Sequence, residues 1–155
     1  MVHDDADSFA AAMPPTGALM GLDLGTKTIG VAVSDGLRQV ASPLEVIRRT
    51  KFTADAARIA ELAGPRAVVG VVLGLPRNMD GSEGPRAQST RAFARNLTRI
   101  LPLPIALWDE RLSTVAAERA LLEADASRRK RSGVIDRVAA GYILQGMLER
   151  LRHLG

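Results

Sequence analysis

Hydrophobic and polar positions alternate with a period of two in the first third of the chain, which predicts β-strands. Ala18 to Leu24 forms a short apolar run, and Gly25 provides a turn after it. Thr28 to Asp35 then alternates isoleucine and valine with small residues, and Gln39 to Arg48 forms a third extended run. Because the connections between these runs are short, we expect an antiparallel meander of three strands.

The period changes after about residue 50, where helical spacing begins to alternate with short apolar runs. The continuous apolar run "RAVVGVVLGL" predicts a strand that is covered on both faces. Ser113 is a plausible N-cap for a helix through Glu123, and "ASRRKRSG" is interpreted as a basic connector before the last helix. The predicted elements of this part are a helix over Thr53 to Leu62, a strand over Arg66 to Leu75, a helix over Pro85 to Leu101, a strand over Pro104 to Asp109, and helices over Ser113 to Glu123 and Val134 to Arg152.

The order of elements predicts a single α/β domain with a five-stranded mixed sheet. The meander supplies the antiparallel strands, and the later strands join as parallel neighbours through right-handed crossovers that place helices on both faces. This domain is expected to span residues 18–155, a normal length for one domain. Residues 1–17 are expected to form an N-terminal tail, set apart by Pro14 to Gly17, that folds back through Phe9.

Composition limits the kinds of site that the domain can hold. The sequence pI is about 10.3 and the formal net charge is +4, which favours an anionic partner, although a basic surface also serves solubility alone. The chain has no cysteine, and its histidines lie near the two ends, which argues against a zinc cluster. There is no apolar run of about 20 residues and no positively charged signal sequence, so we expect a cytoplasmic protein.

The stretch "MGLDLGTKTIGVAVSD" carries one carboxylate, Asp23, in a predicted buried strand. Burying an unpaired charge is costly, so Asp23 needs a cation, several hydrogen-bond donors, or a place at the exposed end of the strand. One interpretation is a metal ligand of a nuclease, and another is the phosphate-binding hairpin of an ATPase or sugar kinase. A third is a turn aspartate bonded to the amides of Gly25 and Thr26.

Two later segments supply further acids. Asp109 and Glu110 end the last predicted strand, and strand alternation means that they cannot both face one site. Taken alone, they could be surface acids paired with Arg111. Asp136 shares a helix face with Ala140 and other apolar residues, which is unusual for an acid, although a position near the helix N-terminus also favours a carboxylate.

Acids from three distant segments can converge at one edge of the sheet, where they would repel one another unless divalent cations lie among them. Mg²⁺ prefers oxygen ligands, and two such ions can promote phosphodiester cleavage. Arg77, Arg111 and the run Arg128 to Arg131 could then hold the phosphate backbone, although a basic run is often only a solvated connector. The loop Gly74 to Gly84 leads into a helix N-terminus, which is either an anion site or a plain crossover.

Five motifs in order resemble the YqgF/RuvX family of pre-16S ribosomal RNA nucleases and Holliday-junction-resolvase-like proteins. They are "GLDLGTKTIGVAVSD", "VVLGLP", "MDGSEGP", "LWDERLST" and "VIDRVAAGYILQG", and the similarity runs from about Ala18 to Leu154. The resemblance implies a ribonuclease-H-like fold and a nuclease that uses Mg²⁺ or Mn²⁺. It implies that Asp23, Glu110 and Asp136 are the catalytic, metal-binding carboxylates. The candidate nucleic-acid-binding residues are Lys27, Arg77, Arg111, Arg129, Lys130 and Arg131.

The chain departs from the pattern of the family that it resembles at two points. Many members have an Arg-Ile-Gly run after the first aspartate, where this chain has the run Lys27 to Gly30, and related resolvases place an acid at the end of the fourth strand, where this chain has "LGLP". The second ligand must then come from the fifth strand, and we expect Glu110 to face the site and Asp109 to face away or bond backbone. ATPases with a similar hairpin need two such domains, and this chain has the length of one.

The substrate stays open at this level. Processing of the 5′ end of pre-16S ribosomal RNA is the favoured function. A DNA junction resolvase, or an RNA-binding assembly factor of the small ribosomal subunit precursor without catalysis, are the alternatives. A monomer and a homodimer are both compatible with the sequence.

Overall fold

The computed structural model describes residues 1–112 and 128–154, with side chains described up to residue 112 and from residue 138 to 154. The predicted helix over Ser113 to Glu123 therefore lies outside the described residues. The strands are β1 (Val2–His3), β2 (Ala18–Leu24), β3 (Thr28–Ser34), β4 (Ala41–Arg48), β5 (Val68–Leu75) and β6 (Ile105–Asp109). The helices are α1 (Ala6–Ala11), α2 (Phe52–Ala63), α3 (Pro85–Ile100), the 3₁₀ turn η1 (Glu110–Leu112) and α5 (Arg128–Leu154).

The strands form one sheet in the order β1-β6-β5-β2-β3-β4. The predicted meander is confirmed, because β2, β3 and β4 pair antiparallel, whereas β5 pairs parallel with both β2 and β6. The count of five strands is wrong, because β1 adds a sixth that pairs parallel with β6. A strand of two residues shows no measurable alternation, so its sequence could not reveal it.

The N-terminal segment packs against the domain. The side chain of Asp5 caps α1 by accepting a hydrogen bond from the Ser8 amide at 2.7 Å. Phe9 is fully buried, as expected for a segment that folds back through this side chain. It joins Met13 and apolar residues of α5 in the smaller of two cores.

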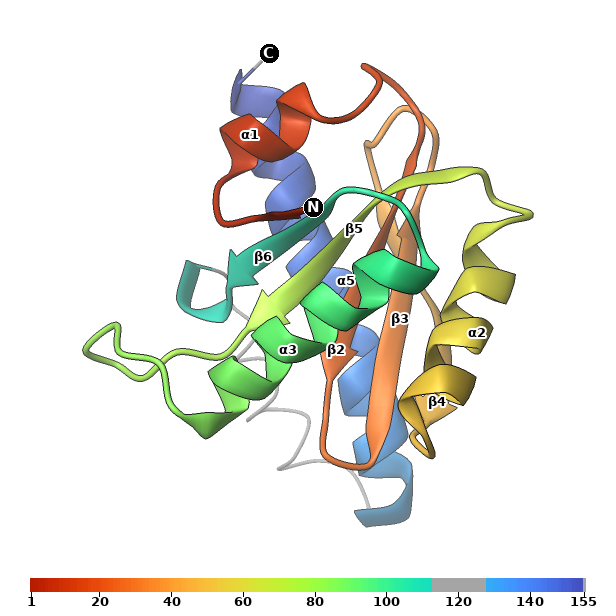
Figure 1. Cartoon of the computed structure of the whole chain (residues 1–155), viewed down its shortest axis with the longest axis vertical. Helices are drawn as coiled ribbons and strands as arrows, with labels where there is room; N and C mark the ends of the chain where they lie inside the picture. Colours follow the sequence, from red (N-terminus) through yellow and green to blue (C-terminus); the bar gives the residue numbers. More distant parts are fainter. Residues whose placement is uncertain (113–127, 155) are drawn as a thin grey trace.

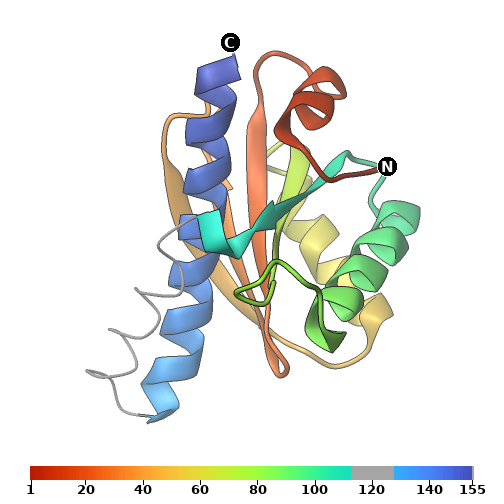
Figure 2. The same ribbon diagram turned by 90° about the vertical axis from the view of Figure 1, so that its left-hand side faces the viewer.

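Helices cover both faces of the sheet (Figures 1 and 2). α2 and α3 pack on one face, whose core includes Leu22, Leu73 and Leu107. α5 and α1 pack on the other face, against Leu19, Val72 and Trp108. These side chains belong to the same three strands, so each strand supplies alternate residues to each core. No helix in the described part of the chain is long and apolar enough to span a membrane.

The interpretation of "ASRRKRSG" as a connector is wrong for its basic part, because α5 begins at Arg128 rather than at Val134. Gly133 lies between the run and the predicted start of the last helix at Val134. Glycine costs a helix only about 1 kcal/mol, however, and arginine and lysine are good helix formers. The basic run therefore forms the first turn of α5, and Asp136 lies in the third turn.

The close approach of α5 to the sheet depends on Gly21 in β2. A Cβ atom at this position would lie 2.7 Å from Leu144 Cβ and 2.9 Å from the backbone oxygen of Ala140. Because a backbone atom cannot move aside without moving the helix, we expect Gly21→Ala to lower the free energy of unfolding by about 1–3 kcal/mol. Gly36→Ala is the control, since nothing lies within 4 Å of its Cβ position. Denaturant unfolding of both variants tests this, and equal stability would contradict the close contact.

Candidate active site

Asp23 lies near the carboxyl end of β2, on the face that α5 covers. Gly21 contacts α5 directly, and side chains two residues apart on a strand share a face, so Asp23 lies on the same side. The side chain of Asp23 is only 2% exposed. A carboxylate at this depth is costly unless charge or hydrogen-bond partners compensate for the loss of water.

Glu110 follows β6 and starts the turn η1. Its Oε1 atom lies 2.7 Å from the position that a Cβ on Gly74 would occupy. Gly74 follows Leu73, which pairs with Leu22, so Gly74 lies next to Asp23 in the parallel register of β5 and β2. The carboxylate of Glu110 therefore rests on the strand residue beside Asp23, and both acids lie on the α5 side of the sheet.

Asp109 lies on the opposite side of the sheet from Glu110. Its strand partner Leu75 belongs to the core under α2 and α3. Asp109 accepts hydrogen bonds from the Arg111 backbone amide at 2.9 Å and from Arg111 Nη2 at 2.8 Å. The prediction that Asp109 bonds backbone while Glu110 faces the other way is confirmed. Asp109 thereby fixes the turn that carries Glu110.

The pKa of the Asp109 carboxyl is held below its ordinary value of 3.8, chiefly by the hydrogen bond from the Arg111 side chain. A lowered pKa means that the carboxylate stabilises the fold fully above pH 3.8, and that this contribution disappears as the pH falls through the lower folded-state pKa. We expect Asp109→Asn to lower the free energy of unfolding at pH 7 by about 1 kcal/mol, because the partly exposed Arg111 loses an ionic partner. Denaturant unfolding from about pH 7 to about pH 2 should show this gap closing below about pH 4. A gap that is independent of pH would contradict the role given to the charge.

The candidate phosphate-binding residues have unequal surroundings. Lys27 is exposed at the tip of the β2–β3 hairpin. Arg111 is engaged by Asp109, and Arg77 lies 3.5 Å from Glu83 and 3.9 Å from Asp109. A phosphate at either arginine would therefore compete with a carboxylate. Arg129, Lys130 and Arg131 lie in the first turn of α5, and their side chains are outside the described residues.

Asp136 lies in α5, but its side chain is outside the described residues. The face of the helix on which it was predicted does face the sheet, because Ala139, Ala140 and Ile143 are buried. Within residues whose side chains are described, no three His, Asp or Glu side chains form a group that could hold a metal ion. The structure therefore brings together two of the predicted acids, Asp23 and Glu110.

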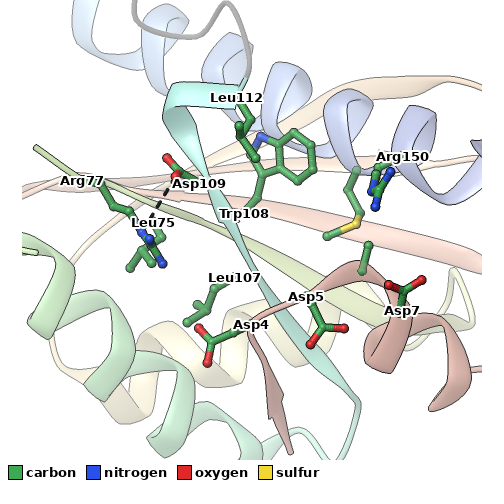
Figure 3. Close-up of a pocket in the computed structure, with 12 residues that line it drawn as sticks. Asp4, Asp5, Asp7, Leu75, Arg77, Leu107, Trp108, Asp109, Leu112 and Arg150 are labelled. Atoms are coloured by element: carbon green, nitrogen blue, oxygen red, sulfur yellow. Dashed lines mark ion pairs between the residues drawn. The ribbon is translucent and has the colours of Figure 1, made fainter. Parts of the chain in front are cut away.

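A separate cavity of about 320 Å³ lies between α1, β6 and the end of α5 (Figure 3). Its wall includes Asp5, Asp7, Trp108 and Arg150, together with the Arg77–Asp109 pair that Figure 3 marks with a dashed line. Sequence patterns did not reveal it, because the N-terminal acids gave no sign that they fold against β6. Neither Asp23 nor Glu110 is among the residues that line it.

Comparisons with known proteins show which family and which folds this chain resembles. The model of the family RuvX, described as Holliday junction resolvase, matches residues 17–150. Proteins named "Putative pre-16S rRNA nuclease" from Paracoccus denitrificans and Cereibacter sphaeroides are 74% and 72% identical over 155 residues, which cover 100% of this chain and 98% and 97% of theirs.

Solved structures of resolvases share the fold at low sequence identity. RuvC of Thermus thermophilus in complex with a Holliday junction substrate has a TM-score of 0.54 and 13% identity, over 88% of this chain and 96% of RuvC. The yeast mitochondrial resolvase Ydc2 has a TM-score of 0.51 and 13% identity, over 96% of this chain and 84% of Ydc2. The fold is ribonuclease-H-like, with the six-stranded sheet described above. The family model matches most of the chain, and the relatives share about three residues in four with it. This chain therefore belongs to the YqgF/RuvX family.

Proposed function

We propose that this protein is a divalent-metal-dependent nuclease that hydrolyses phosphodiester bonds, with Asp23, Glu110 and Asp136 as its catalytic, metal-holding carboxylates. The observation that carries the proposal is the meeting of Asp23 and Glu110 on the α5 side of β2 and β5. They come from segments far apart in sequence, and the glycine between them leaves space for the second carboxylate. Two acids placed so closely favour a shared cation over mutual repulsion.

The register of α5 supports Asp136 as the third member. α5 runs antiparallel to β2 (Figure 1), and the backbone oxygen of Ala140 lies beside Gly21. Position 136 is four residues earlier in the helix, a rise of about 6 Å. Asp23 is two residues later in the strand, about 7 Å in the same direction. The backbone at position 136 is therefore level with Asp23.

The donor set fits Mg²⁺ or Mn²⁺, because these ions prefer carboxylate oxygens and the proposed ligands are all carboxylates. When bound, such an ion would supply an activated water and stabilise the charge that develops on the phosphate oxygens. The contribution of the protein is to hold Asp23 rigidly in a buried strand, and to hold Glu110 through the turn that Asp109 fixes.

Basic residues around this edge are proposed to bind the phosphate backbone. Lys27 is exposed at the hairpin two residues after the turn glycine, and the first turn of α5 carries Arg129, Lys130 and Arg131. Arg77 and Arg111 lie at the ends of β5 and β6, beside the turn that bears Glu110. Contacts of this kind position a strand without selecting its sequence.

The substrate that we favour is ribosomal RNA, at the 5′ end of the pre-16S species, because the full-length relatives carry that name. The family description favours a second candidate, a four-way DNA junction. Both substrates are phosphodiesters, so the same carboxylates would serve either reaction. A protein that acts on pre-16S RNA in bacteria would work in the cytoplasm, alone or as a homodimer.

One assay separates these functions. The purified protein is incubated with a pre-16S RNA fragment and with a four-way DNA junction, each with Mg²⁺, with Mn²⁺ and with chelator. We expect metal-dependent cleavage of the RNA at a defined position. Cleavage of the junction alone would replace RNA by DNA as the substrate. Tight RNA binding without cleavage under any metal condition would favour an assembly factor and refute the nuclease.

A further inference from the structure

A cleft of about 240 Å³ lies beside the β2–β3 hairpin, on the opposite side of β2 from Asp23 and Glu110. Figure 1 shows this hairpin at the lower end of the sheet. Its walls come from the β2–β3 hairpin, the segment after β4 and the first turns of α3. Arg49 and Arg86 supply its positive charge. The other residues that line it are Leu24, Gly25, Thr26, Pro85, Ser89 and Thr90.

Both arginines are held in place by backbone oxygens of the segment that follows Asp23. Arg49 Nη1 donates to the oxygen of Gly25 at 2.6 Å, and Arg86 Nη2 donates to the oxygen of Leu24 at 3.4 Å. The Arg49 guanidinium also lies 5.9 Å from the centre of the Phe93 ring. The backbone amide of Arg49 donates a hydrogen bond to the backbone oxygen of Lys27 at 2.8 Å. These contacts use neutral partners, so they fix the side chains without neutralising their charge.

The two arginines differ in this respect from those predicted to bind nucleic acid. Arg77 and Arg111 lie within 4.0 Å of a carboxylate, whereas no described carboxylate forms an ion pair with Arg49 or Arg86. Each guanidinium retains N–H donors beyond the one given to backbone, and a guanidinium matches the oxygens of a phosphate in a bidentate manner. Hydroxyl groups of Thr26 and Ser89, both on exposed residues, offer further donors at the rim.

We propose that this cleft is a phosphate-binding subsite that holds the backbone of the nucleic-acid strand next to the catalytic carboxylates. Gly25 is two residues from Asp23, a distance of about 7 Å along a strand. A nucleic-acid strand with one phosphate at the carboxylates would therefore reach the cleft within a few nucleotides. The inference rests on the proposed function for the identity of the ligand as a nucleic acid. Arg49 and Arg86 would position the strand, and they would not select its sequence.

Binding of a short single-stranded RNA without divalent metal tests the subsite separately from cleavage. We expect Arg49→Ala/Arg86→Ala to weaken RNA binding by about tenfold or more. The slope of log affinity against log salt concentration should become shallower by about 0.7 for each phosphate that the protein no longer neutralises. The matched control is Arg95→Ala/Arg99→Ala, which removes the same charge from exposed positions of α3. Arg49→Lys/Arg86→Lys keeps the positive charge but loses the bidentate geometry of the guanidinium. Its RNA affinity should therefore lie between those of the Arg49→Ala/Arg86→Ala variant and the control.

Two results would overturn the proposal. Equal weakening by the cleft variant and the control would indicate a general effect of charge. The second result is binding of inorganic phosphate that requires Arg49 and Arg86, while Arg49→Ala/Arg86→Ala leaves the RNA affinity unchanged. This result would assign the cleft to free phosphate. Because Arg49 also contacts Phe93, the single variant Arg86→Ala provides a test on an exposed residue, and thermal melting verifies folding. Wild-type protein that shows arginine-dependent binding but no cleavage with either Mg²⁺ or Mn²⁺ would refute the nuclease while leaving the phosphate subsite.

Discussion

Asp23→Asn is expected to abolish metal-dependent cleavage, with a loss of at least about 10³-fold in rate, which corresponds to about 4 kcal/mol of transition-state stabilisation. Asparagine keeps the shape of the side chain but offers one weak oxygen ligand instead of a charged carboxylate. Because Asp23 is 2% exposed and lies beside Gly74, against which the Glu110 carboxylate rests, we expect that removing one negative charge also relieves repulsion in the metal-free protein. The variant should therefore melt at the same temperature as the wild type without metal, or at a higher one.

Thermal melting with and without Mg²⁺ or Mn²⁺ provides a second measurement that does not depend on activity. A ligand that binds only the folded state raises its stability, so metal should raise the melting temperature of the wild type but not of Asp23→Asn. The control is Glu61→Gln, which makes the same chemical change at an exposed position of α2. Cleavage by Asp23→Asn at the wild-type rate would remove Asp23 from the site, whatever the metal does to stability.

The sequence was sufficient to predict five of the six strands and the position of the buried acid, because both depend on local patterns. A strand with an acid in an apolar run is recognisable without tertiary information, and Asp23 is indeed buried near the end of β2. Alternation also predicted that Asp109 and Glu110 would point to opposite faces. The family resemblance was needed to choose Glu110, because both acids lie at the same strand end.

Features that depend on how distant segments meet could not be predicted. The role of Gly74 becomes visible only when β5, η1 and α5 are in contact, since nothing in "VVLGLP" specifies what lies above the glycine. Arg49 and Arg86 are unremarkable in sequence and lie beside one another only after the hairpin, β4 and α3 have packed. The helix α5 begins earlier than predicted, because a single glycine does not end a helix and the arginine and lysine residues before it are good helix formers.

Gly74→Ala should reduce cleavage strongly, by about 10²-fold, because the added methyl group competes with the Glu110 carboxylate for one space. Its Cβ would lie 2.7 Å from Glu110 Oε1 and would also overlap Ile143 Cδ1. Ile143 is fully buried, so this variant should also lose about 1–3 kcal/mol of stability through overpacking. The decrease in activity and the decrease in stability thus have different atomic causes, which a second substitution can separate.

Ile143→Val removes the Cδ1 atom that the new methyl group would meet, but it leaves the Glu110 contact unchanged. The double variant Gly74→Ala/Ile143→Val should therefore recover most of the stability that Gly74→Ala removes, while its cleavage rate stays low. Ile143→Val alone is the control, with near wild-type cleavage and a stability cost of about 1 kcal/mol. Denaturant unfolding and single-turnover cleavage of the four proteins complete the cycle. If cleavage recovers together with stability in the double variant, then Gly74 serves only the packing of α5 on the sheet. In that case the absence of a side chain at position 74, where β5 carries no acid, would not be what allows Glu110 to reach the site.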